Sequence, residues 1–163
     1  MVDLTTGVHR GTLQPRKLLK NDGSIDGTQV VNTVRVPDPG RKQDDESAEM
    51  ETITSFLSAS AIRSKHSLDD VDWCSSNSSP VCAVREISVP VLVVTAQGHY
   101  FLRDGEHLYG ESASADKDYI VVEGMTHGLG NCTACAAFHG TGPYTNVPLH
   151  LWDYVRDWAN ARF

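Results

Sequence analysis

Positive charge is scarce in this 163-residue sequence. Lys and Arg together number 14 against 21 Asp and Glu, which leaves a net charge of −7 at pH 7. A surface this acidic repels phosphate backbones and anionic lipid headgroups. The composition therefore argues against nucleic acid and membrane surfaces as partners.

Long apolar runs and a secretion signal are also lacking. No apolar stretch approaches the ~20 residues that are needed to cross a bilayer. The first seven residues, MVDLTTG, have neither a basic start nor an apolar stretch, so we expect no signal peptide in this chain. Hydrophobic residues make up 40% and charged residues 21%, which is typical of a globular domain with its own core.

Cysteine is limited to four residues, and they lie in two local pairs, Cys74 with Cys82 and Cys132 with Cys135. Two short-range pairs are typical of disulfides that hold loops in an exported protein, secreted or periplasmic. Free thiols are one alternative. A zinc site is the other, because His127 and His139 flank the C-x-x-C and supply ligands that zinc accepts. Disulfides are the favoured interpretation, so no metal and no other cofactor is expected.

The chain divides by composition into two parts. Residues 1–48 form an irregular N-terminal segment in which Thr28–Val36, rich in β-branched residues, predicts one strand. Residues 49–163 contain the periodic segments. The first of these, Glu49–Arg63, has apolar residues at spacings of three and four and predicts a helix.

The C-terminal half predicts alternating strands and helices. Val89–Val94 and Tyr119–Val122 are continuous apolar runs, as expected for strands that are buried on both faces of a parallel sheet. Asp104–Ala115, with Asp104 as its N-cap, and Leu149–Phe163 predict helices. This βαβα order predicts an α/β fold, a parallel sheet with flanking helices.

One histidine stands at a position that suits chemistry. His127 lies between Gly124 and Gly128, directly after the second predicted strand. Ligands bind at the carboxyl ends of the strands in open α/β sheets. An imidazole at that edge is able to take a proton from a hydroxyl and return it to a leaving group.

From Ser88 onward, the strand at Val89–Val94, the GHYFLRDGE and EGMTHG stretches and the terminal helix WDYVRDWANARF resemble the end of a microbial α/β-hydrolase. The resemblance implies a partial α/β-hydrolase-like sheet with His127 as the catalytic base. It places the orienting acid near residues 97–106, where Asp104 and Glu106 are the candidates. His99 and Tyr100, at the same predicted edge, are candidate substrate-binding residues.

The chain departs from that family upstream. The family nucleophile sits in a G-x-S-x-G elbow between a strand and a helix, and no such motif occurs here. We therefore expect an esterase-like hydrolase of a small acyl substrate, in which this chain supplies part of the catalytic unit. The alternatives are a non-catalytic binding module derived from a hydrolase and, more weakly, a small zinc-binding domain. An incomplete sheet also predicts self-association or a complementing chain.

Overall fold

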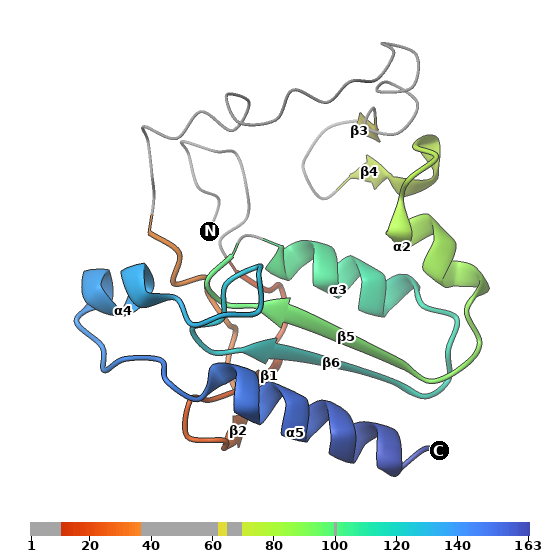
Figure 1. Cartoon of the computed structure of the whole chain (residues 1–163). Helices are drawn as coiled ribbons and strands as arrows, with labels where there is room; N and C mark the ends of the chain where they lie inside the picture. The colour runs from red at the N-terminus through yellow and green to blue at the C-terminus, as the bar shows by residue number, and fades with distance from the viewer. Residues whose placement is uncertain (1–10, 37–61, 65–69, 100) are drawn as a thin grey trace, which may run out of the picture.

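The computed structural model describes residues 11–36, 62–64, 70–99 and 101–163 (Figure 1). The predicted helix over Glu49–Arg63 lies outside these residues up to position 61, and Arg63 itself belongs to a short strand. The described part has a four-stranded, mostly parallel sheet in the order β2-β1-β6-β5, with helices flanking it. The predicted α/β fold is confirmed at this level.

Two parallel strands form the centre of the sheet. β5, Val91–Ala96, pairs with β6, Lys117–Val122, from Val91 opposite Lys117 to Ala96 opposite Val122. Between them the chain crosses over through α3, Leu102–Glu111. Residues 119–122 of β6 are each no more than 3% exposed, so the continuous apolar run marks a strand covered on both faces.

The N-terminal segment adds two strands to the same sheet. β1, Lys17–Leu19, pairs parallel with β6, and β2, Ile25–Asp26, pairs antiparallel with β1. The predicted strand over Thr28–Val36 is wrong, because in that segment only Asn32 forms an isolated bridge, with Gly11. Strand propensity measures how well side chains suit a pleated, half-buried surface, and it does not show which segment reaches the edge of β6.

Helices cover opposite faces of the sheet (Figure 1). Tyr119 and Val121 pack in the cluster that includes Leu102 of α3. Ile120 and Val122 pack in the other cluster, which includes Leu151 of α5, Val147–Asn160. The alternation of side chains along β6 therefore separates two cores.

The predicted helix over Asp104–Ala115 is displaced in the structure. α3 begins at Leu102 and ends at Glu111, and its N-cap position is Phe101. Asp104 is therefore not the N-cap. It lies in the first turn, where a carboxylate still interacts favourably with the positive end of the helix dipole.

Shorter elements lie before β5. The strands β3, Arg63–Ser64, and β4, Val71–Asp72, form a small hairpin. The 3-10 turn η1, Trp73–Ser75, the helix α2, Pro80–Ala83, and the 3-10 turn η2, Val84–Glu86, follow. The remaining helix, α4, spans Thr133–His139 after the His127 turn. No helix among the described residues has the length and apolar character of a membrane span.

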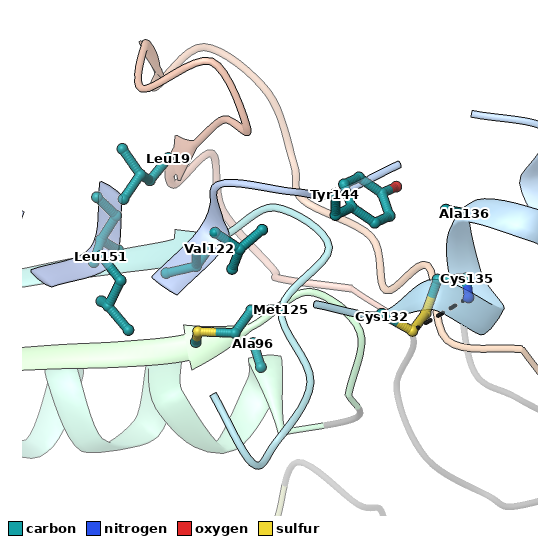
Figure 2. Packing of buried hydrophobic residues seen from close by; sticks show 11 residues of the cluster. Leu19, Ala96, Val122, Met125, Cys132, Cys135, Ala136, Tyr144 and Leu151 are labelled. Carbon is teal, nitrogen blue, oxygen red and sulfur yellow. Dashed lines mark hydrogen bonds between the residues drawn. A yellow bond between two sulfur atoms is a disulfide. The ribbon is translucent and has the colours of Figure 1, made fainter. Parts of the chain in front are cut away.

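Both predicted cysteine pairs form disulfides. The Cα–Cα distances are 5.0 Å for Cys74–Cys82 and 5.2 Å for Cys132–Cys135, within the usual range for bridged cysteines. Cys132 and Cys135 are part of the buried cluster that Figure 2 shows together with Met125, Tyr144 and Ala136. Two disulfides are typical of proteins from oxidising, extracellular-type environments.

The zinc alternative needs the sulfur atoms of Cys132 and Cys135 as ligands. These two sulfur atoms are bonded to each other in a disulfide, so they do not serve as metal ligands. Within the described ranges, no three His, Cys, Asp or Glu side chains gather in a way that could hold a metal ion.

Candidate active site

His127 lies in a tight turn directly after β6, where the sequence pattern placed it. Main-chain bonds hold this turn against its neighbours. The Gly98 amide donates to the Met125 carbonyl at 2.8 Å, and the Thr126 amide donates to the Gly130 carbonyl at 2.8 Å. The histidine therefore stands at the carboxyl ends of β5 and β6, on a turn with a defined backbone.

The turn requires glycine at position 124. Gly124 has a φ of +60°, and a Cβ atom there would lie 2.2 Å from Cγ of Tyr144. The residue thus combines a left-handed backbone with a close approach to a buried ring, and both favour glycine. The EGMTHG stretch forms this turn because its first glycine permits the chain to reverse beneath Tyr144.

Two aromatic rings, those of His99 and Phe101, lie beside the candidate base His127. The ring centroids of His99 and His127 are 4.7 Å apart, and those of His99 and Phe101 are 4.5 Å apart. Phe101 also meets His127 edge-on at 5.6 Å. The structure therefore brings His127 together with His99, one of the two residues that the sequence suggested for substrate binding. The other, Tyr100, lies outside the described residues.

His99 has an unusual electrostatic environment. Burial lowers its pKa from 6.5 to about 4, and the positive charges of Arg35 and of protonated His127 act in the same direction. The imidazole of His99 is therefore neutral at pH 7. The ring that stacks on His127 offers it no positive charge at that pH.

Two cavities meet at this histidine pair. The larger, about 750 Å³, has Arg35, Thr126 and the Cys132–Cys135 disulfide in its wall. The smaller, about 480 Å³, has a mainly apolar wall, and its large side chains are Trp73, Val81, Phe101, Leu108, Met125 and Leu129. His99 and His127 line both cavities.

The two candidate acids are placed differently. Asp104 lines the smaller cavity together with His127. Glu106 lines neither cavity. It is 7% exposed, and its carboxylate accepts from the main-chain amides of Leu13 and Gln14 and pairs with the guanidinium groups of Arg16 and Arg103. Its contacts anchor the N-terminal segment to α3.

No serine occurs among the described residues that line either cavity, and the four cysteines are all in disulfides. Sequence reasoning also missed Phe101 and Arg35 as neighbours of the histidines. Arg35 gave no signal, because it comes from the N-terminal segment, far from His127 along the chain. Phe101 follows two residues after His99, and that proximity was the one available clue.

Comparison with models of known protein families, with curated proteins and with solved structures finds no match to this chain.

Proposed function

We propose that this chain carries the general base of an α/β-hydrolase-type hydrolase that acts on an ester or related acyl bond. His127 is the base, and Asp104 is the carboxylate that orients it. One observation carries the proposal: both side chains line an apolar cavity at the carboxyl ends of two parallel strands, where α/β folds bind their ligands.

The chemistry follows from these groups. The imidazole of His127 takes the proton of an attacking hydroxyl as its oxygen bonds to the acyl carbon, and returns that proton to the departing alcohol. Asp104 favours the imidazolium that forms between the two steps. The apolar wall of the smaller cavity suits an uncharged acyl group, so the proposed substrate is a small ester-like molecule.

A second function rests on a different observation. No serine lines either cavity within the described residues, which favours a binding module that holds an acyl ligand without cleaving it. The disulfides support an exported location for either function, secreted or periplasmic, because such bonds persist in oxidising compartments.

Hydrolysis of p-nitrophenyl esters tests the proposal. The His127→Ala variant is expected to lose at least 100-fold in kcat/KM, the usual contribution of a positioned base. His150→Ala is the matched control, because His150 lies on α5 and lines neither cavity. It should retain full activity. If the wild-type protein binds a fluorescent fatty acid but cleaves no ester, the hydrolase proposal is wrong and the binding module is the supported function.

A further inference from the structure

The two cavities at the histidine pair differ in the charge of their walls. Asp104 lines the smaller cavity, whose remaining wall is mainly apolar. Arg35 lines the larger cavity, and no Asp or Glu among the described residues does so. An anionic group is therefore repelled from the smaller cavity and attracted to the larger one. Because His99 and His127 line both cavities, the two walls together suit a ligand with one uncharged end and one anionic end.

Hydrogen bonds place Arg35 beside the turn that follows β5. The Val34 amide donates to the Gln97 carbonyl at 3.0 Å, and the Thr33 hydroxyl donates to the same oxygen at 2.7 Å. The Arg35 amide donates to the Thr33 hydroxyl oxygen at 3.1 Å. From α4, Nε2 of His139 donates to the Val34 carbonyl at 2.9 Å. The backbone that carries Arg35 is therefore held between the end of β5 and α4.

The side chain of Gln97 joins the same segment to the turn of His127. Its Nε2 donates to a main-chain carbonyl of the N-terminal segment at 3.1 Å, and its Oε1 accepts from the Gly124 amide at 3.2 Å. Burial is the main cause of the low pKa of His99, and the positive charge of Arg35 contributes to it. The charge of Arg35 therefore acts at the histidine pair itself.

We propose that the larger cavity binds the alcohol part of the ester, and that this part carries a carboxylate held by the guanidinium of Arg35. The inference rests on the proposed function, in which the smaller cavity takes the acyl group. A guanidinium donates two parallel N–H groups to a carboxylate. The neutral ring of His99 adds no second positive charge, so the wall suits a singly charged carboxylate better than a phosphate dianion. The volume of about 750 Å³ is within the range of small-molecule sites.

The overall charge of the chain makes any preference for an anion a local property. The net charge of −7 disfavours the approach of anions from a distance, so selection of an anionic ester has to come from groups at the site. The carboxylate keeps its charge throughout the reaction, and Arg35 therefore holds it equally in the ground state and in the transition state. Such uniform binding lowers KM and leaves kcat unchanged.

Two esters with the same acyl group and similar size, meta-carboxyphenyl butyrate and meta-carbamoylphenyl butyrate, test the inference. The wild type should prefer the carboxylate ester about tenfold in kcat/KM, as expected for a charge-assisted pair. Arg35→Gln should remove this preference through KM, and Arg35→Lys should keep part of it because the charge remains. Arg156→Gln removes the same charge from α5, lines neither cavity and should keep the wild-type preference. If both esters are cleaved without a preference, or if the preference survives in Arg35→Gln, the inference is overturned and the proposed function stays.

Binding of the free alcohol parts separates the carboxylate site from the chemistry, and its first step needs no variant. In saturation-transfer NMR titrations, meta-hydroxybenzoate should bind the wild type about tenfold more tightly than meta-hydroxybenzamide. If neither ester is cleaved but this difference is present in the wild type and lost in Arg35→Gln, the carboxylate site stays and the proposed function falls. Equal binding of the two compounds, or binding of neither, overturns the carboxylate site even where esters are cleaved.

Discussion

The two outer sides of the β5–β6 strand pair are covered in different ways. On the β6 side, β1 lies in parallel register, from Lys17 opposite Ile120 to Leu19 opposite Val122. Lys17 also donates to Asp118 at 2.8 Å. On the β5 side, no strand follows within the described residues, and the covering comes from short elements around Trp73 and Val81. The outer side of β6 is covered by a paired strand and an ion pair. The outer side of β5 is covered only by side chains.

This difference bears on function, because the site lies at the less complete edge. His99 lies in the turn after β5, and His127 shares a cavity with the last residues of that strand. Edges with unpaired amides and carbonyls favour the addition of a further strand. A site at such an edge is one that a second polypeptide can complete, whereas β1 already occupies the other side of β6.

The largest expected loss of stability comes from a change in Glu106, whose contacts hold the N-terminal segment, including β1, against α3. Glu106→Gln keeps the shape of the side chain but removes the charge that faces Arg16 and Arg103. Removing one partner from a buried charge network leaves the others uncompensated, so we expect a loss of about 3 kcal/mol in the free energy of unfolding. Urea titration measures it, and limited proteolysis should show earlier cleavage in the N-terminal segment.

Glu111→Gln is the matched control for that change. Glu111 is also on α3 and also pairs with an arginine, Arg85 at 2.8 Å, but the two side chains are 40% and 45% exposed. Exposed pairs contribute roughly 0–1 kcal/mol, so this variant should unfold close to the wild type. Equal losses in the two variants would show that burial of the Glu106 network does not set its strength.

Prediction from sequence succeeded where one strong pattern acted alone. The apolar run at Tyr119–Val122 predicts a doubly covered strand, and the glycine-flanked His127 after it predicts a turn at the sheet edge. Both are confirmed. Prediction from sequence failed where contacts with residues far away in the chain determine the local structure. Lys17–Leu19 has no β-branched residue, and it forms a strand because it lies beside β6. The anchoring contacts of Glu106 depend on main-chain amides more than ninety positions away, which no local spacing reveals.

A loss of stability of intermediate size is expected when the disulfide beside the smaller cavity, on the β5 side, is removed. The Cys74–Cys82 disulfide holds the loop that contributes Trp73 and Pro80 to the smaller cavity. Replacing both cysteines by serine should lower the free energy of unfolding by about 2 kcal/mol on the chain-entropy model for a short loop. It should also weaken binding of a fluorescent fatty acid, because the cavity loses a fixed wall. Unchanged binding would show that the wall holds its position without the bond.

The Cys132–Cys135 pair supplies the control for that prediction. Both cysteines line the larger cavity and neither lines the smaller one, so the corresponding double serine variant should lose stability without losing affinity for an apolar ligand. Thiol titration of the denatured, unreduced wild type should find no free thiol.

The smallest expected effect is the pH dependence that His99, on the β5 side, gives to the free energy of unfolding. Burial lowers the pKa of His99 to about 4, below the value of about 6.5 in an unfolded chain. The unfolded state therefore binds more protons between these two values, and stability falls as the pH is lowered from 7 toward 4. Between pH 7 and pH 5 we expect a loss on the order of 1 kcal/mol, reduced by solvent screening of a half-buried ring. His99→Gln removes this proton site, so its stability should fall less over the same interval in urea titrations. His150→Gln, on the opposite face, should follow the wild type. Parallel pH profiles for wild type and His99→Gln would mean that His99 takes up its proton in the folded state as readily as in the unfolded one.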